Sequence, residues 1–120
     1  MKTPPKISES EWEIMRLLWE KSPLTANQVH EKAGIHLQTA KTFLSRLAKK
    51  GAIAFKKSGR SFQYSPLFTE LECQKHASRS FLARVFGGSL QPMISHLVEE
   101  NALSEEEIEK LRKVLNNRKK

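Results

Sequence analysis

The side chains between His36 and Gly51 have the chemistry of a surface that binds a polyanion. At helical spacing the apolar residues of this segment fall on one face, while the other faces carry cations, hydroxyls and an amide but no carboxylate. Cations suit phosphate oxygens, and short polar side chains suit base edges. The candidate DNA-binding residues are Gln38, Thr39, Lys41, Thr42, Ser45, Arg46 and Lys49, together with Lys57 and Arg60 further along the chain.

The charge of the chain is concentrated around this segment. The 120 residues carry a net charge of +8, and residues 1–64 hold twelve Lys and Arg against five Glu. From Lys32 to Thr69 there are eight basic residues and no acidic one. Such a local excess favours nucleic acid or an anionic membrane surface as the partner. A membrane-surface helix needs a free apolar face, which a folded domain would use internally, so duplex nucleic acid is the better expectation.

Other kinds of chemistry find little support. The chain contains no Asp, no Gly-rich phosphate loop and no nucleophile elbow, and Glu11 and Glu13 fit helix capping and solvated faces. Cys73 and His76 have a spacing that suits one helix face, but two ligands do not make a metal site. We expect no enzymatic activity, no cofactor and no metal, and a structural role for Cys73.

Location follows from composition. A single cysteine fits a reducing compartment, no apolar run approaches the roughly 20 residues of a membrane span, and the first residues lack the apolar segment of a signal peptide. We therefore expect a cytoplasmic protein without a membrane partner.

The elements that position these side chains are recognisable from their starts. Four sites combine a hydroxyl residue with Glu or Gln three positions later, between two apolar residues, which is typical of a capping box with a hydrophobic staple. These pairs are Ser8 with Glu11, Thr25 with Gln28, Thr69 with Glu72, and Ser104 with Glu107. The predicted helices span residues 8–21, 25–33, 36–50, 69–86, 89–100 and 104–117, the third starting at His36 or Leu37 and the fifth with Ser89 as its cap.

Between the third and fourth helices the apolar period changes to two. Residues 52–57 and 61–65 alternate apolar and polar side chains around a basic tip, which predicts a β-hairpin. Its aromatic residues Phe55, Phe62 and Tyr64, with Phe43 of the third helix, are expected in the core. Three helices followed by a hairpin predict a winged helix-turn-helix, with the third helix in the DNA major groove and the hairpin against the backbone.

The expected fold is mainly α with a small β-hairpin, in two parts. Residues 1–66 form the winged helix-turn-helix DNA-binding domain, and residues 67–120 form a helical dimerisation domain, because three short helices cannot bury all their apolar side chains alone. The candidate dimerisation residues are Leu71, Phe81, Leu82, Val85, Ile94, Leu97, Val98, Ile108, Leu111 and Leu115. A packed subdomain remains the alternative for this part. For the whole chain, the alternative is a winged helix that binds RNA or protein, disfavoured because single-strand binders expose aromatics and here the aromatics are expected in the core.

Several stretches together resemble the BlaI/MecI/CopY penicillinase-repressor family. They are ISESEWEIMRLLWEKSPLTANQVHEK, TAKTFLSRLAKKGAI, SFQYSPL and LVEENALSEEEIEKLRKVL, which cover nearly the whole chain. The resemblance implies a homodimeric transcriptional repressor that binds a palindromic operator through the N-terminal winged helix and dimerises through the C-terminal helices. By motif position it also implies recognition-helix contacts from Gln38, Thr39, Lys41, Thr42 and Arg46.

The resemblance bears on the inducing signal as well. The beta-lactam-responsive members are inactivated by a sensor protease at an Asn-Phe bond, and the matching dipeptide here is His96-Leu97. The copper-responsive members carry paired Cys-x-Cys motifs near the C-terminus, which this sequence lacks. A sensor protease is thus a further candidate partner with an altered target bond, and the copper site is not expected.

Overall fold

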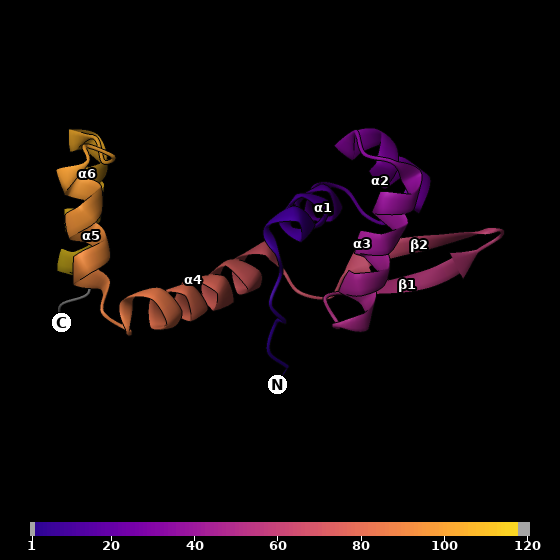
Figure 1. Cartoon of the computed structure of the whole chain (residues 1–120), viewed down its shortest axis with the longest axis horizontal. Coiled ribbons are helices and arrows are strands. Elements are labelled where there is room, and N and C mark those ends of the chain that lie inside the picture. Colours follow the sequence, from indigo (N-terminus) through magenta and orange to yellow (C-terminus); the bar gives the residue numbers. More distant parts are fainter. Residues whose placement is uncertain (1, 118–120) are drawn as a thin grey trace. The chain divides into compact units, whose positions relative to one another are not determined.

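The computed structural model describes residues 2–117, and most of them are helical. The elements are α1 Glu9–Glu20, α2 Ala26–Ala33, α3 Leu37–Lys49, β1 Ile53–Ser58, β2 Ser61–Pro66, α4 Glu70–Phe86, α5 Leu90–Glu99 and α6 Glu105–Asn117 (Figure 1). The fold class predicted from the sequence, helical with one hairpin, is confirmed. The chain divides into two compact units, Met1–Ser78 and Arg79–Lys120, whose boundary falls within α4.

All four predicted capping boxes form. At α1 the Ser8 hydroxyl accepts from the Glu11 N–H at 3.2 Å, and a Glu11 carboxylate oxygen accepts from the Ser8 N–H at 2.9 Å. The same reciprocal bonds occur at the starts of α2, α4 and α6. The other two helices are different: His36 and Ser89 occupy the N-cap positions of α3 and α5, but neither side chain makes a capping hydrogen bond.

The hairpin of β1 and β2, with its Gly59-Arg60 turn, is called the wing below. Its strands pair antiparallel in a register that sets Phe55 opposite Tyr64 and Lys57 opposite Phe62. Gly59 has a φ of 63°, a left-handed conformation that suits glycine in a tight turn. An isolated bridge between Leu24 and Tyr64 ties the residue before α2 to the wing.

The core of the first unit lies where α1, α2, α3 and the base of the wing meet. Ile14, Met15 and Leu18 supply the face of α1, and Leu44 and Leu47 the face of α3, all with at most 1% of their surface exposed. Because these residues recur every three or four positions, each helix presents one apolar stripe inward and leaves its remaining faces to solvent. This packing fixes which side of α3 faces outward.

Two aromatic residues of the wing do not belong to the core, contrary to the prediction. Phe55 is 58% exposed and Phe62 is 44% exposed, whereas Phe43 and Tyr64 are partly buried and pack against the core. In β1 only the first residue, Ile53, is buried. The strands run beyond the helices that cover their base. The alternation of apolar and polar side chains therefore continues into a part of the wing that no helix covers.

The second unit has no comparable interior among its described residues 79–117. Neither α5 nor α6 contains a buried residue, and in α4 the one buried residue is Cys73, which belongs to the first unit. Phe81, Val85, Val98 and Leu115 are each more than 40% exposed.

Candidate nucleic-acid interface

The outward side of α3 carries the side chains that the sequence analysis selected. Ala40, Leu44 and Leu47 are buried, which turns the intervening positions toward solvent. The exposed candidates on α3 are Gln38, Thr39, Lys41, Ser45, Arg46 and Lys49, and Thr42 is partly buried among them. Lys57 on β1 and Arg60 in the wing turn are also exposed. Every candidate is therefore at the surface of the first unit, and none is consumed by its core.

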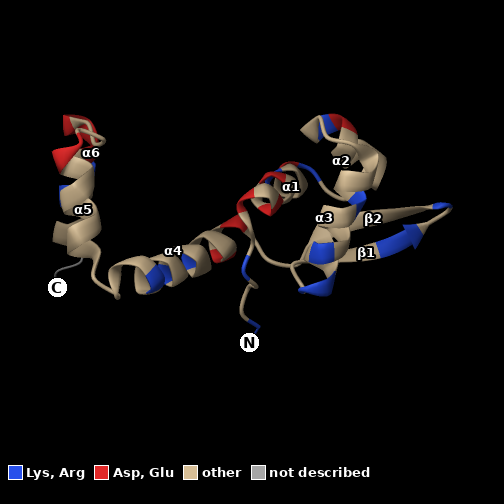
Figure 2. Ribbon diagram, in the orientation of Figure 1, with Lys and Arg blue, Asp and Glu red and all other residues tan. Residues whose placement is uncertain are grey.

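Charge on these elements is of one sign. In Figure 2 the blue of Lys and Arg lies along α3, β1 and the wing turn. The red of Glu appears on α1, at the end of α2 and at the start of α4. Of the eight cations between Lys32 and Thr69, Lys50 forms an ion pair within residues 2–117. The remaining cations of this stretch make no ion pair within the described chain, so their charges are available to a ligand.

The Thr42 hydroxyl is held by its own helix. It donates to the Gln38 carbonyl oxygen at 3.0 Å, a bond from one turn to the previous one. The oxygen retains acceptor capacity, and the methyl group is then fixed in direction. Thr42 can therefore offer an oriented methyl and an acceptor to a ligand, which is the chemistry needed next to a thymine methyl and a base amino group.

Lys50, directly after α3, is occupied inside the protein. Its ammonium lies 2.7 Å from a carboxylate oxygen of Glu11 and 2.9 Å from the Lys6 carbonyl oxygen. Glu11 is only 2% exposed, so the sequence prediction of a capping residue on a solvated face is correct for the cap and wrong for the exposure. Glu11 lies 39 positions from Lys50 in sequence, and no local pattern indicates this pair.

The environment of Glu11 keeps it charged. Burial by itself would raise the pKa of this carboxyl group, but the hydrogen bond from Lys50 and those from Ser8 outweigh burial and hold the pKa below its ordinary value. Glu11 is thus an ionised anchor for the end of α3, and Lys50 is a structural cation.

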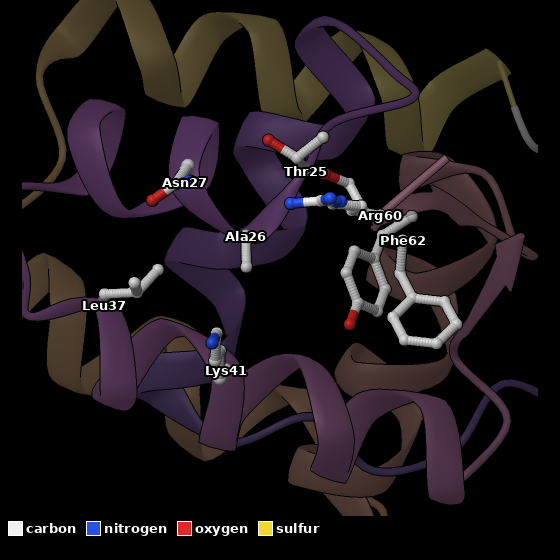
Figure 3. A pocket seen from close by; sticks show the side chains of 9 residues that line it. Thr25, Ala26, Asn27, Leu37, Lys41, Arg60 and Phe62 are labelled. Carbon is white, nitrogen blue, oxygen red and sulfur yellow. The ribbon is translucent and has the colours of Figure 1, made fainter. Parts of the chain in front are cut away.

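A groove connects α3 with the wing. It has a volume of about 430 Å³ and is lined by Thr25, Ala26, Asn27, Leu37, Lys41, Arg60, Ser61, Phe62 and Tyr64. Figure 3 shows Lys41 of α3 and Arg60 of the wing turn on the walls of this space, with Phe62 beside Arg60. The structure therefore brings two of the predicted cations, from segments 19 positions apart, to the walls of one groove.

The first turn of α2 also lines this groove, and the sequence analysis did not predict it as part of the interface. Thr25, Ala26 and Asn27 line it, at a helix end where backbone N–H groups point outward and the dipole favours anions. The capping box at Thr25 already located this helix end, but nothing local indicates that the wing folds back beside it. The bridge between Leu24 and Tyr64 joins these two segments.

Other site chemistry is not found in the described residues. Cys73 is buried, and burial together with the neighbouring Glu72 carboxylate raises the pKa of its thiol. No three His, Cys, Asp or Glu side chains among residues 2–117 lie close enough together to hold a metal ion. Within the same residues, none of the helices is both long and apolar enough to cross a lipid bilayer. The His96-Leu97 dipeptide lies inside α5.

Comparison with protein families matches nearly the whole chain. The model of the family described as "Penicillinase repressor" matches residues 7–117. The methicillin resistance regulatory protein MecI of Staphylococcus aureus is 35% identical over 117 residues, covering 94% of this chain and 95% of that protein. The penicillinase repressor of Bacillus licheniformis is 38% identical over 127 residues, covering 100% of this chain and 99% of that protein.

Solved structures agree with the fold of the first unit. The solution structure of the DNA-binding domain of the repressor BlaI is 37% identical, with a TM-score of 0.52, and covers 60% of this chain and 93% of that domain. The B. licheniformis BlaI monomer in complex with the blaP half-operator has a TM-score of 0.51 and the same coverage. FabT of Streptococcus pneumoniae, at 23% identity and a TM-score of 0.51, shares the fold alone.

These matches confirm the resemblance found in the sequence. The identity extends over both units and rests on more than the helix-turn-helix, and the surface of α3 and the wing has the charge that a DNA contact requires. The chain therefore belongs to the penicillinase repressor family of DNA-binding transcriptional repressors.

Proposed function

We propose that this protein is a homodimeric repressor that binds a palindromic duplex operator, with α3 in the major groove and the wing against the backbone. The observation that carries the proposal is the outward side of α3, which presents cations, hydroxyls and an amide without a carboxylate. A helix of this composition can approach phosphates without repulsion and still contact base edges.

Within the proposed interface the residues divide into two roles. Thr42, Thr39 and Gln38 lie in the first half of α3, where side chains of a recognition helix reach base edges. Arg46 and Lys49 lie one to two turns later and are assigned to phosphates, as are Lys41, Arg60 and Lys57. Ser45 completes the polar surface between these two groups.

The groove beside α2 supports a seat for a backbone phosphate. Lys41 and Arg60 approach it from two elements, and the first turn of α2 supplies outward N–H groups. A phosphate held there would fix the register of α3 along the groove without reading sequence. The function of this groove is therefore positioning, and its effect should be equal on all duplexes.

Dimerisation is assigned to α4, α5 and α6. Leu71, Phe81, Val85, Val98 and Leu115 are exposed, while Leu82, Ile94, Leu97, Ile108 and Leu111 are partly buried. All of these except Leu71 belong to the second unit, whose described residues 79–117 include no buried side chain. Apolar side chains this exposed favour pairing with an identical copy. Two recognition helices then lie about 34–36 Å apart, the spacing of successive major-groove faces.

Other functions are less well supported. Relatives named as penicillinase repressors and a BlaI structure in complex with a half-operator favour duplex DNA over RNA or protein as the partner. We assign no catalytic role, because the family acts by binding, and we propose a cytoplasmic location, where such a repressor meets its operator.

The experiment is selection of bound sequences from a random duplex library by the full chain, followed by titration of the selected duplex at several salt concentrations. A palindromic consensus and a steep fall of affinity with salt are expected. Enrichment of no sequence, or of a single half-site only, contradicts the proposal. Recovery of bound genomic fragments would then identify the regulated genes.

Two substitutions on α3 separate its roles. Thr42→Ala should lower affinity for the selected duplex by roughly a factor of ten and leave non-specific affinity unchanged, because a lost base contact costs about 1–3 kcal/mol at that site only. Arg46→Ala should weaken binding to every duplex and reduce the salt slope by about one. If both variants behave alike, the division of roles is wrong.

A further inference from the structure

Two phenylalanine rings stand exposed on the wing. Phe55 is 58% exposed and Phe62 is 44% exposed, and their ring centroids lie 5.5 Å apart in an edge-to-face arrangement with an interplanar angle of 89°. Phe55 also contacts the ring of Tyr64, at a centroid distance of 6.3 Å. Contacts of this kind hold aromatic rings in one orientation. The aromatic pair, Phe55 and Phe62, is thus a pre-arranged apolar ridge.

The ridge lies on the face of the wing that continues from the core. Alternation and register place Ile53, Phe55 and Lys57 of β1 on one face, with Phe62 and Tyr64 opposite them on β2. Phe62 is also a wall of the groove that Lys41 and Arg60 enter (Figure 3). The aromatic pair is therefore continuous with the candidate nucleic-acid interface.

Charge indicates what can cover this ridge. No acidic residue occurs between Lys32 and Thr69, and Lys57 shares the face of the aromatic pair. A partner that covers the ridge must then have an apolar surface bordered on both sides by negative charge. The minor groove of duplex DNA has this combination, because phosphates border it and deoxyribose forms its walls, and proteins that enter it use apolar side chains together with cations.

We propose that the aromatic pair is a minor-groove contact, seated against the deoxyribose walls while Lys57 and Arg60 meet the flanking phosphates. The proposal rests on the proposed function and adds a second kind of contact to it. An apolar contact displaces water but releases no counterions, so it strengthens binding without adding to the salt dependence.

The test uses the full chain and the duplex obtained by selection. Phe55→Ser with Phe62→Ser should lower affinity at least tenfold, since burying the exposed half of one such ring is worth roughly that factor, and the slope of affinity against salt should not change. The matched control is Lys56→Ala, on the opposite face of β1, which removes charge and leaves the ridge intact. The wild-type complex should protect deoxyriboses from hydroxyl radicals where the wing lies. The double variant should lose protection at those deoxyriboses and keep it elsewhere on the bound duplex.

A second measurement does not depend on the stability of the variant. The photoreactive residue p-benzoylphenylalanine, introduced in place of Phe55, should cross-link to the selected duplex, and introduced in place of Lys56 it should cross-link much less. Equal cross-linking from the two faces contradicts the proposal, even if the serine variant fails to fold.

Each remaining outcome is decisive. If the wild-type chain selects no duplex, the proposed function fails and this inference fails with it. If the wild type binds and the double variant binds equally well, only the inference fails. Loss of binding to oligo(dT), loss of binding to phosphatidylglycerol vesicles, or loss of self-association in the double variant, with duplex affinity unchanged, would assign the ridge to a single strand, a membrane surface or a second copy instead.

Discussion

Replacing Lys50 tests whether the cations around α3 are divided between structure and ligand binding. Lys50 and Lys49 are neighbours, but Lys50 pairs with buried Glu11 at 2.7 Å and Lys49 is exposed without an ion pair among residues 2–117. Lys50→Ala should therefore destabilise the first unit and leave the salt slope of DNA binding unchanged. Lys49→Ala, the matched control, should leave the stability of the first unit unchanged and reduce the salt slope of DNA binding.

The magnitude follows from the burial of the two partners. Removing one partner of a fully buried pair costs about 3–5 kcal/mol, whereas exposed pairs contribute about 0–1 kcal/mol. Here the Glu11 side chain is 3% exposed and that of Lys50 is 33% exposed, and Ser8 still donates a hydrogen bond to Glu11 after the substitution. We expect a loss of about 2 kcal/mol in the free energy of unfolding, between those limits.

Urea unfolding, followed by tryptophan fluorescence, measures this loss of stability in the first structural unit. Trp12 and Trp19, the two tryptophans of the chain, both lie in the first unit with ring centroids 5.6 Å apart, so their emission reports its unfolding. The same variants are titrated with duplex at several salt concentrations. Equal unfolding midpoints for the two variants, or a reduced salt slope for Lys50→Ala, would refute the division.

The dependence on pH provides an independent check through Glu11→Gln. Because the pKa of Glu11 is lower in the folded state than its ordinary value of 4.5, the pair contributes stability above that value and loses it as pH falls through the folded pKa. The difference in unfolding free energy between wild type and Glu11→Gln should be constant near neutral pH and shrink below about pH 4.5. A difference that grows on acidification contradicts the reasoning.

Three further predictions concern the first unit. Leu44→Ala should lower the free energy of unfolding by about 2–4 kcal/mol, measured by urea unfolding, because Leu44 is fully buried. Trp19→Phe should cost about 1 kcal/mol in the same assay, since it removes the 2.8 Å hydrogen bond from the indole to the Phe68 carbonyl oxygen. Cys73 should react with iodoacetamide at pH 8 far more slowly in the native than in the urea-unfolded chain, because burial raises the pKa of its thiol and restricts access.

The parts of the fold that the sequence predicted are those set by neighbours along the chain. Capping boxes join residues three positions apart, and a helix stripe repeats every three or four, so each can be recognised within a short window. The same reasoning predicted the outward side of α3, because its buried positions follow from periodicity. All four capping pairs and the wing were therefore predictable.

What escaped prediction depends on contacts between distant segments. The Glu11–Lys50 pair, the Trp19–Phe68 hydrogen bond and the Leu24–Tyr64 bridge each join residues about 40 or more positions apart. No local pattern specifies such partners, because they arise only when the helices pack. The groove beside α2 was missed for the same reason.

The error at Phe55 and Phe62 has a different origin and a functional meaning. Alternation correctly assigned both rings to the face that continues from the core, but it does not indicate how far along the strands the core extends. The expectation that these aromatics are buried is one of the arguments that the sequence offers against binding of a single strand. Their exposure removes that argument and gives the wing an apolar surface beside its charged one.

The arrangement of charges explains how a cation-rich surface can coexist with a stable fold. Lys50 sits at the junction of α3 and the wing, and its charge is neutralised by a carboxylate that belongs to α1, so the end of α3 is anchored without placing an acid on the outward side. The neighbouring cations make no ion pair among residues 2–117 and repel one another, which costs some stability in the free protein. A polyanionic ligand relieves that repulsion. The surface therefore favours the bound state both by attraction to phosphates and by release of strain among its own charges.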